Sequence, residues 1–392
     1  MKTADIIARE DRFQIPTYAK FPIALVRGEG SYVWDGEGKR YLDFYGGHCV
    51  TLLGHCPPAV VQAVQRQAET LLFYSNVVYS DVRSRAAALL AEMAPGGLGN
   101  VYFCNSGTEA NETALKIARK RTGRSVVVST EGGFHGRTLG SLAVTWTPSY
   151  RQPYLSALPE TVFVPFGDAE AVRSALAEHA DVAALIVEPI QSMAGITEAP
   201  SRYFQELRRL CTEHEVALIF DEIQTGVGRT GTFSISEQLD VTPDFITLAK
   251  GLGSGVPVGA VLAGDRFAAS VGRGDQGTTF GGGMLAMAAV EATLLTIQQS
   301  DLMARAQQVH DRIRGHLEAD VAEVRGRGCL MGLNLGEPVA PLLDALRQEG
   351  VLAGGSAHPN VIRLMPPINT TDRTVDEFVQ AFERARATAA VP

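Results

Sequence analysis

The sequence predicts an α/β fold, with a mostly parallel central sheet flanked by helices and a smaller second domain. Short, nearly continuous apolar runs alternate with segments of helical spacing, as in strands that are buried on both faces of a parallel sheet. These runs are 101–104, 125–129, 162–164, 182–187, 216–220 and 245–248. The first fifty residues instead alternate around glycine turns. With 392 residues, of which 45% are hydrophobic, the chain is long enough for two to three domains.

The elements follow in order along the chain. We expect a small antiparallel meander near 24–26, 32–34 and 41–44, because glycine-containing turns at 27–30 and 35–38 separate these runs. Helical spacing indicates helices at 59–72, 80–94, 108–121, 284–295 and 375–387. We therefore expect an N-terminal segment of the small domain at 1–55, a large domain at 56–298, and the C-terminal part of the small α+β domain at 299–392.

Composition limits the possible partners. The net charge of −8 gives no basic surface for nucleic acid or anionic membranes, and no apolar run approaches the length of a membrane span. The five cysteines form no Cys-x-x-Cys pair, and the histidines show no metal-ligand spacing. The charged residues 1–12 contain no apolar core segment, so we expect no standard secretory signal. We expect a cytoplasmic protein that binds small molecules, without a bound metal, nucleic acid or membrane.

The first candidate site is the junction between the apolar run 101–104 and the helix that follows it. Ser106, Gly107 and Thr108 form a tight turn, and Ser106 and Glu109 have the spacing of a capping box. A helix N-terminus at the carboxyl end of a parallel strand offers free N–H groups and a partial positive charge to a phosphate. The alternative is that Ser106 only caps its own helix.

The second candidate is the acid pair Asp221-Glu222, which ends the apolar run 216–220. Acidic residues just past a buried strand are where α/β folds place ligand-binding side chains, and we expect one of the two to point inward. A buried carboxylate needs a cation or strong donors to remain charged, and a protonated ring nitrogen of a cofactor would meet that need. The alternative is a helix cap or a surface turn.

The third candidate is Lys250, which follows the apolar run 245–248 and precedes a glycine-rich loop. Most lysines are solvated surface charges. At the end of an uncharged strand, however, the amine is partly desolvated, which lowers its pKa and makes it a nucleophile for carbonyl groups.

The three candidates together match one cofactor. A phosphate seat, an anion and a carbonyl-binding lysine are the partners that the phosphate, ring nitrogen and aldehyde of pyridoxal 5′-phosphate require. The segment Gly226–Gly231 satisfies the dinucleotide pattern G-x-G-x-x-G, which leaves a nucleotide-dependent oxidoreductase as an alternative of another class. Two carboxylates stand where pyrophosphate would approach, however, and no helix start follows this segment. A Gly-x-Ser-x-Gly hydrolase motif is absent.

The chain resembles the class III, fold-type I pyridoxal-phosphate aminotransferases, and within them the acetylornithine and ornithine aminotransferases. The resemblance extends from about residue 18 to residue 382. It is carried by Arg27-Gly-Glu-Gly, Asn105-Ser-Gly-Thr-Glu-Ala-Asn111, Phe134-His-Gly-Arg-Thr138, Glu188-Pro-Ile-Gln191, the stretch from Asp221 to Gly231, Leu248-Ala-Lys-Gly251, Thr279-Phe-Gly-Gly282 and Arg363-Leu-Met-Pro-Pro367.

This resemblance implies roles for individual residues. Lys250 would bind the cofactor aldehyde as a Schiff base and transfer the proton, and Asp221 would pair with the ring nitrogen. The remaining cofactor contacts would be Ser106, Gly107, Thr108, Phe134, His135, Glu188, Ile223 and Gln224. Thr279 would reach the phosphate of a neighbouring subunit, so the resemblance also implies a homodimer.

The same resemblance implies substrate contacts and a reaction. Arg137, assisted by Tyr18, would bind the α-carboxylate of the donor, and Arg363 would bind the α-carboxylate of glutamate or 2-oxoglutarate. We expect ping-pong transfer of the ω-amino group of N-acetylornithine, or of a related amino acid, to 2-oxoglutarate. Alternatives are donors such as a β-amino acid, alanine with glyoxylate, 4-aminobutyrate, lysine or an amine, and an aminomutase reaction.

Two positions depart from the family pattern. A glutamate that masks the second arginine usually stands where this chain has Met193, and His48 replaces an apolar or tyrosine side chain. Both would line the substrate pocket. They either pack there or change specificity away from ornithine derivatives.

Overall fold

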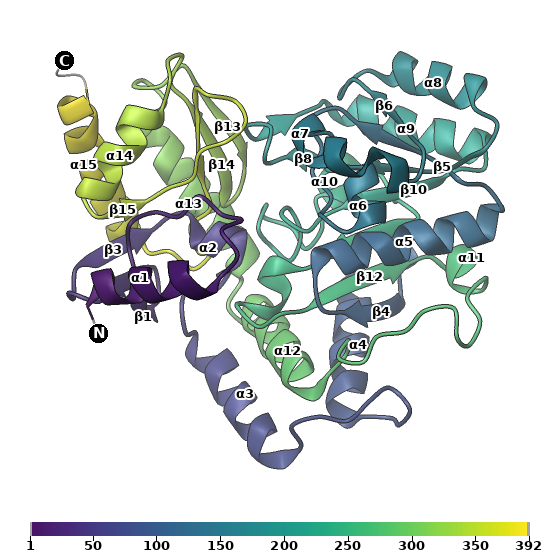
Figure 1. The fold of residues 1–392 in the computed structure, drawn as a ribbon, viewed down its shortest axis with the longest axis horizontal. Coiled ribbons are helices and arrows are strands. Elements are labelled where there is room, and N and C mark those ends of the chain that lie inside the picture. Colours follow the sequence, from purple (N-terminus) through teal and green to yellow (C-terminus); the bar gives the residue numbers. More distant parts are fainter. Residues whose placement is uncertain (1, 390–392) are drawn as a thin grey trace.

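The structure is a computed structural model that describes residues 2–389. Its large domain is built on a seven-stranded sheet with the order β4-β12-β11-β10-β7-β5-β6 (Figure 1). All neighbouring strands are parallel except β12, which is antiparallel to both of its neighbours. The strands are β4 (Asn100–Cys104), β5 (Val126–Thr130), β6 (Thr161–Val164), β7 (Val182–Val187), β10 (Ala217–Asp221), β11 (Phe245–Leu248) and β12 (Gly259–Ala263).

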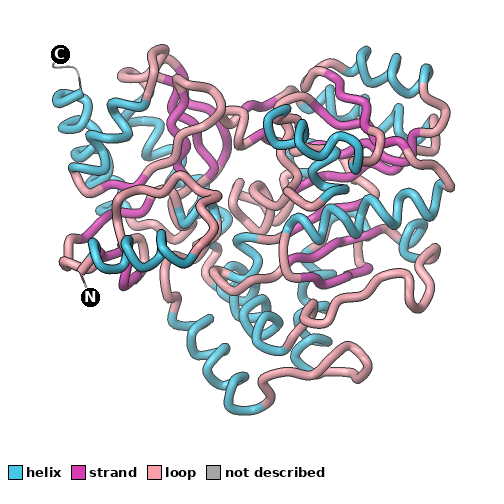
Figure 2. Tube along the Cα trace, in the orientation of Figure 1, coloured by secondary structure: helices cyan, strands magenta, loops and turns pink. Residues whose placement is uncertain are grey.

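Helices cover both faces of this sheet (Figure 2). Side chains of β10 alternate between the two sides: Ile219 joins the apolar cluster that includes helix α5, and Phe220 joins the cluster that includes α9. The helices of this part are α3 (Pro58–Thr70), α4 (Asp81–Met93), α5 (Gly107–Thr122), α6 (Leu139–Ala143), α7 (Pro148–Arg151), α8 (Ala169–Glu178), α9 (Ser201–Glu213), α10 (Ser236–Leu239), α11 (Asp265–Ala268) and α12 (Met284–Gln299). A two-stranded ribbon joins β8 (Ile190–Gln191) to β9 (Thr197–Glu198).

The two ends of the chain meet in a second, smaller part of the molecule. Strands β1 (Leu25–Glu29), β2 (Tyr32–Asp35) and β3 (Arg40–Asp43) form an antiparallel meander, and β15 (Val351–Leu352) adds to β3 in parallel. A separate antiparallel sheet contains β13 (Glu323–Arg327), β14 (Leu330–Asn334) and β16 (Val361–Leu364). The helices here are α1 (Thr3–Phe13), α2 (Gly46–Cys49), α13 (Leu302–Leu317), α14 (Ala340–Gln348) and α15 (Asp372–Ala389).

The predicted fold class is confirmed, and each predicted strand and helix has a counterpart within a few residues. Two of the elements that had no predicted range show why a pattern can fail. Helix α1 lies in a polar N-terminal segment and buries no residue, so it has no apolar pattern to reveal it. Strand β12 follows the glycine-rich loop after Lys250, and its antiparallel direction breaks the expected alternation of strand and helix. The domain limits at 55/56 and 298/299 stay predictions.

No helix within residues 2–389 combines the length and the apolar composition that crossing a membrane requires.

Candidate active site

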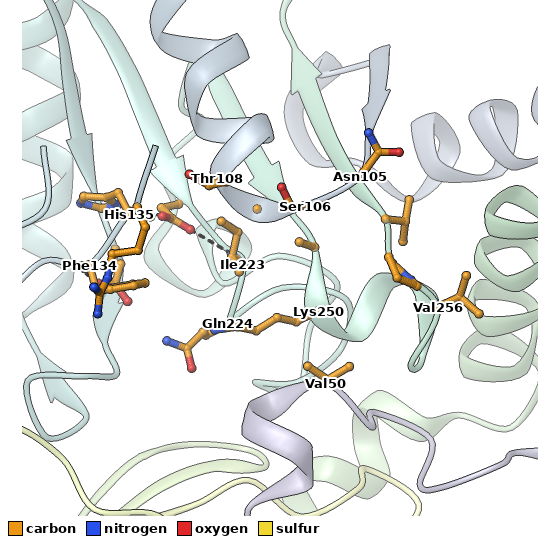
Figure 3. Close-up of a pocket in the computed structure, with 18 of the residues that line it drawn as sticks. Val50, Asn105, Ser106, Thr108, Phe134, His135, Ile223, Gln224, Lys250 and Val256 are labelled. Carbon is orange, nitrogen blue, oxygen red and sulfur yellow. Dashed lines mark hydrogen bonds and ion pairs between the residues drawn. The ribbon is translucent and has the colours of Figure 1, made fainter. Parts of the chain in front are cut away.

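The predicted cofactor-binding residues, except Thr279, converge on a cavity of about 490 Å³ at the carboxyl ends of β4, β10 and β11 (Figure 3). Open α/β sheets bind their ligands at this edge. The residues that line it are Val50, Asn105, Ser106, Gly107, Thr108, Phe134, His135, Gly136, Arg137, Glu188, Asp221, Ile223, Gln224, Ala249, Lys250, Gly255, Val256, Pro257 and Val258.

Lys250 begins a short 3-10 helix (Lys250–Gly253) directly after β11 and has a left-handed backbone, with φ of 43°. Its side chain extends into the cavity (Figure 3). Burial lowers the pKa of its amine, and the charges of nearby Glu188 and Asp221 oppose that shift. The other five lysines, at 2, 20, 39, 116 and 120, are all exposed. Lys250 is therefore the lysine whose surroundings favour a neutral, nucleophilic amine.

Asp221 ends β10, and three donors stabilise its buried carboxylate. Oδ2 accepts hydrogen bonds from Asn111 Nδ2 and from His135 Nδ1, both at 2.8 Å, and Oδ1 accepts one from the Ile223 amide at 3.1 Å. Asn111 is itself oriented by Thr247, whose hydroxyl donates to Asn111 Oδ1 at 2.7 Å. This network gives Asp221 the environment of a fixed, charged carboxylate that faces the cavity.

Glu222, the other member of the acid pair, is also buried but does not line the cavity. It accepts hydrogen bonds from the Ser234 hydroxyl, from the Ile235 amide at 2.9 Å and from Thr225 Oγ1 at 3.3 Å. Burial raises the pKa of Glu222 to about 7, and these donors only partly oppose the shift. Of the two acids, only Asp221 faces the cavity.

The N-terminus of α5 borders the cavity at Gly107 and Thr108. Ser106 is its N-cap and accepts from the Glu109 amide at 3.4 Å, while the Glu109 carboxylate accepts from the Asn105 amide at 2.6 Å. The serine half of the expected capping box is present, whereas Glu109 bonds the amide of Asn105, one residue before the N-cap; the first amides of the helix are left without acceptors inside the helix. A side chain at Gly107 would place its Cβ 2.5 Å from Ile223 Cδ1, so it would displace the Ile223 side chain that lines the cavity.

Three further buried polar side chains line the cavity, and two of them have an atom without a hydrogen-bond partner in residues 2–389. Glu188 Oε1 accepts from the Phe134 amide at 2.7 Å, and burial raises the pKa of Glu188 to about 7. Within residues 2–389, His135 Nε2 and Gln224 Oε1 are buried without a hydrogen-bond partner. Buried polar atoms are rarely left unpaired, so these two suit a ligand with polar groups of its own.

Arg137 lies at the mouth of the cavity and is exposed. Its guanidinium stacks on Tyr150, 3.4 Å from the ring centroid, and lies 5.9 Å from the centroid of Phe134. In the described part of the chain it forms no ion pair, so its charge is available to a carboxylate.

The other predicted substrate residues do not line this cavity. Arg363 is buried in β16; its Nε donates to the Gly355 carbonyl at 2.7 Å and its Nη1 to Ser192 Oγ at 3.2 Å. His48 is half-buried in α2, and charges on Lys250 and Arg363 act on its ring. Met193 follows Ser192, and its carbonyl accepts from the Ala357 amide at 2.8 Å. These three therefore lie on the side of the small domain.

Tyr18 and Thr279 lie further out. Tyr18 is 80% exposed, and Thr279 lies in an exposed loop. The preceding residue, Thr278, accepts from Asn105 Nδ2 at 3.1 Å, which places this loop beside the N-terminus of α5. Neither residue contributes to the cavity within this single chain.

Sequence reasoning missed several contributors. Asn111 stands four residues after Gly107, so a helix would place it on the same face one turn further on, and this spacing was the available signal. Thr247, in β11, contributes by donating a hydrogen bond to Asn111. Val256, Pro257 and Val258 line the cavity after the glycine-rich loop. Nothing in their local sequence distinguishes them from ordinary core residues.

The chain was compared with protein-family models, curated proteins and solved structures. The model of the family "Aminotransferase class-III" matches residues 14–385. The chain belongs to the class III aminotransferases. Among curated relatives, the acetylornithine aminotransferase of Methanopyrus kandleri is 47% identical over 92% of this chain and 94% of its own length. That of Bacillus subtilis is 39% identical over 95% of this chain and 97% of its own.

Solved structures of class III aminotransferases have the same fold. The ornithine aminotransferase of Toxoplasma gondii superposes with a TM-score of 0.91 at 30% identity, over 99% of this chain and 96% of that one. The acetylornithine aminotransferase of Elizabethkingia anophelis superposes with a TM-score of 0.86 at 30% identity, over 99% of this chain and all of that one. Class III aminotransferases are pyridoxal-phosphate enzymes, and one Toxoplasma structure carries that cofactor at partial occupancy in its active site.

Proposed function

We propose that this class III aminotransferase binds pyridoxal 5′-phosphate in the described cavity and transfers the ω-amino group of N-acetylornithine to 2-oxoglutarate. The observation that carries the proposal is the convergence of Lys250, Asp221 and the N-terminus of α5 on one cavity. The acetylornithine aminotransferases among its relatives, 39–47% identical over nearly the full chain, support the choice of donor.

The residues of the cavity suit the cofactor group by group. The free amides at Gly107 and Thr108 suit a phosphate, and the fixed carboxylate of Asp221 suits a protonated ring nitrogen. Gln224 and His135 each offer a buried polar atom that has no protein partner in residues 2–389. Phe134 offers an aromatic face, and Ile223 packs under Gly107. When bound, the cofactor supplies a ring that accepts electrons from the substrate carbon.

Lys250 then has two tasks. Its amine, desolvated by burial, would hold the carbonyl carbon of the cofactor, and when free it would take a proton from the substrate carbon and give it back to complete the transfer. The position at the end of β11 keeps this amine within the cavity during both steps. Glu188 and Asp221 lie close enough for their charges to raise the proton affinity of Lys250 against the effect of burial.

Two arginines are suited to bind the carboxylates of the substrates. Arg137, exposed at the cavity mouth, suits the α-carboxylate of the donor. Arg363 is a buried guanidinium without a carboxylate partner in the described residues, and a dicarboxylic keto acid would supply one. A transfer to 2-oxoglutarate uses both arginines in turn.

We also propose a homodimer in which Thr279 serves the neighbouring active site. The loop between α3 and α4, which extends away from the body of the molecule in Figure 2, carries exposed apolar side chains that a second copy would cover. They are Leu71, Leu72, Phe73, Tyr74, Val77, Val78 and Tyr79. Phe280, beside Thr279, packs on Phe73 at 5.1 Å between ring centroids and is itself exposed. The five cysteines are free, which supports a reducing, cytoplasmic location.

Sedimentation of the purified protein tests the dimer, with Val77→Asp as the disruptive variant. We expect a dimer that Val77→Asp dissociates, and a Thr279→Ala variant that stays dimeric but binds the cofactor more weakly. A monomeric wild-type protein would contradict the proposal.

The cofactor is tested by borohydride trapping. The protein is incubated with pyridoxal phosphate, reduced and digested, and the modified peptide is identified by mass. We expect the added mass on Lys250 alone, because the other five lysines are exposed and lie outside the cavity. Lys250→Ala should lose the visible absorbance band, whereas Lys116→Ala should keep it. Labelling spread over the exposed lysines would contradict a specific site.

The donor is tested by a half-reaction. Purified enzyme with bound cofactor is mixed with N-acetylornithine, ornithine, lysine, β-alanine, 4-aminobutyrate or a simple amine, and the loss of the cofactor's carbonyl absorbance is followed. We expect the highest second-order rate with N-acetylornithine. A higher rate with another donor would reassign the specificity, and retention of the amino group on the substrate would indicate an aminomutase.

A further inference from the structure

A turn on the small-domain side of the active site brings Tyr45 and His48 next to Arg363. Residues 46–49 form the four-residue helix α2, in which Gly47 and His48 have left-handed backbones with φ of 54° and 67°. A left-handed conformation is unusual for histidine, and surrounding contacts must enforce it. Asp43 does so: Oδ1 accepts from the amides of Tyr45 at 3.0 Å and Gly46 at 2.9 Å, and Oδ2 accepts from the amide of Gly47 at 3.1 Å.

The turn joins the two aromatic side chains. Tyr45 Oη forms a short hydrogen bond with His48 Nδ1, and the rings meet edge to face with centroids 5.1 Å apart. Tyr45 also packs tightly on the backbone of Gly354, where a Cβ would lie 2.2 Å from Tyr45 Cε2. The tyrosine ring is therefore fixed at its hydroxyl by His48 and along its edge by Gly354.

This fixed ring borders the Arg363 guanidinium, whose central carbon lies 5.9 Å from the ring centroid. The backbone amides and carbonyls of Gly354 and Arg363 are paired, at 2.7 and 3.1 Å, so that the arginine and the glycine under Tyr45 move together. Arg363 is 2% exposed, and within residues 2–389 it has no carboxylate partner; its guanidinium donates to the Gly355 carbonyl and the Ser192 hydroxyl. A buried cation is held by cation–π and hydrogen-bond contacts when no anion is present.

His48 keeps this neighbourhood free of a further positive charge. Burial, together with the charges of Lys250 and Arg363, lowers the pKa of His48 to about 3, so the imidazole stays neutral. Asp43 faces the turn but bonds its backbone amides and His55, and Cys49 directs its thiol to the Gln224 carbonyl. The guanidinium is thus left with its full charge.

We propose that Tyr45 and His48 are positioning residues that orient Arg363 for one carboxylate of a dicarboxylic keto acid, and so determine how well this acceptor class is bound. In this proposal, Tyr45 and His48 take no part in the chemical step, and both act through Arg363. This inference rests on the proposed function, because it assigns the acceptor that the same site selects.

The decisive variant is Tyr45→Phe, which removes one hydroxyl and keeps the ring over Gly354. Binding of glutarate, a five-carbon dicarboxylate without a keto group, is measured by calorimetry on the enzyme loaded with pyridoxal phosphate. We expect the Kd for glutarate and the KM for 2-oxoglutarate to rise at least about fivefold, with kcat and the KM for the donor unchanged. Tyr32→Phe, which removes a hydroxyl bonded to Glu377 at 2.8 Å elsewhere in the small domain, is the matched control and should behave as wild type.

Two variants of His48 complete the test. His48→Asn retains a side chain that tolerates the left-handed backbone and can accept from Tyr45, so it should bind glutarate nearly as wild type does. His48→Phe should weaken glutarate binding as Tyr45→Phe does. If Tyr45→Phe binds glutarate as wild type does, or weakens donor and acceptor equally, the inference is wrong. Failure of the wild-type half-reaction would instead contradict the proposed function, because glutarate binding needs no reaction.

Discussion

The two ends of the active site are built from different kinds of structure. At the Lys250 end, the polar groups follow the carboxyl ends of neighbouring strands, and Asp221 receives three hydrogen bonds. At the Arg363 end, three segments that are far apart in the chain meet: the turn of α2 at 45–48, residues 192–193, and residues 354–363, which lead into β16. There the buried guanidinium has no carboxylate partner within residues 2–389.

This difference in structure corresponds to a difference in role. We expect the Lys250 end to hold the cofactor and the Arg363 end to determine which substrate carboxylate is bound. Strand ends of one sheet have nearly fixed positions, so they suit groups that must hold a cofactor rigidly. Loops tolerate substitution, so they can change which carboxylate is accepted without disturbing the sheet. His48 and Met193, the two positions expected from the resemblance to depart from the family pattern, both lie at the Arg363 end.

The largest effect is expected at the Lys250 end, from Asp221→Asn. The amide keeps the shape of the side chain but removes the charge and turns a donor toward Asn111 and His135. We expect kcat/KM to fall on the order of 10²–10³-fold, the size of effect found when a fixed electrostatic partner is removed. Steady-state kinetics with saturating cofactor checks this.

Glu222→Gln is the matched control, because Glu222 is equally buried and adjacent but faces away from the cavity. Its kcat/KM should stay within about threefold of wild type, since the change does not touch the groups that act on the substrate. If the two variants lost activity equally, the asymmetry between these neighbouring acids would be refuted.

A smaller effect is expected at the Arg363 end, from Met193→Glu. The hydroxyl oxygen of the preceding residue, Ser192, lies 3.2 Å from Arg363 Nη1. We therefore expect the carboxylate of a glutamate at 193 to reach the guanidinium and neutralise its charge. We expect the KM for 2-oxoglutarate to rise roughly tenfold, which corresponds to about 1.4 kcal/mol. Met193→Gln, of the same length but uncharged, should leave this KM near the wild-type value. Equal effects of the two variants would show that length, not charge, matters at this position.

The same contrast explains what could be predicted from sequence. Ser106, Asp221 and Lys250 each follow a continuous apolar run, and parallel strands bring their carboxyl ends to one edge, so local pattern alone placed them together. Arg137 and Phe134 came from the family resemblance, and the structure places both at the cavity.

The Arg363 end offered no such pattern. Tyr45 was not singled out, because its contact with Arg363 depends on β15 pairing with β3 and on Met365 donating its amide to Phe44 at 2.7 Å. Such pairings between residues more than 300 positions apart leave no periodic trace in the sequence. The left-handed backbone at His48 could not be predicted either, because position 48 is not a glycine. The hydrogen bonds from the preceding amides to Asp43, which hold this turn, are seen only in the folded chain.

The smallest expected effect concerns stability and sharpens the contrast between Asp221 and Glu222. The pKa of Glu222 is about 7 in the folded protein, above its ordinary value of 4.5, so the folded state binds more protons than the unfolded state between these limits. The contribution of Glu222 to the free energy of unfolding therefore falls as pH rises from about 5 to 7. Glutamine resembles the protonated acid and cannot ionise, so Glu222→Gln lacks this contribution.

The midpoint of thermal unfolding of Glu222→Gln, measured relative to wild type, should rise by about 1–3 °C between pH 5 and pH 8. Calorimetric scans of both proteins at matched ionic strength give the difference directly. Parallel pH profiles would mean that Glu222 remains charged on its hydrogen-bond donors, which would contradict the prediction. A residual slope common to both proteins is expected from Glu188, whose raised pKa of about 7 acts in the same sense.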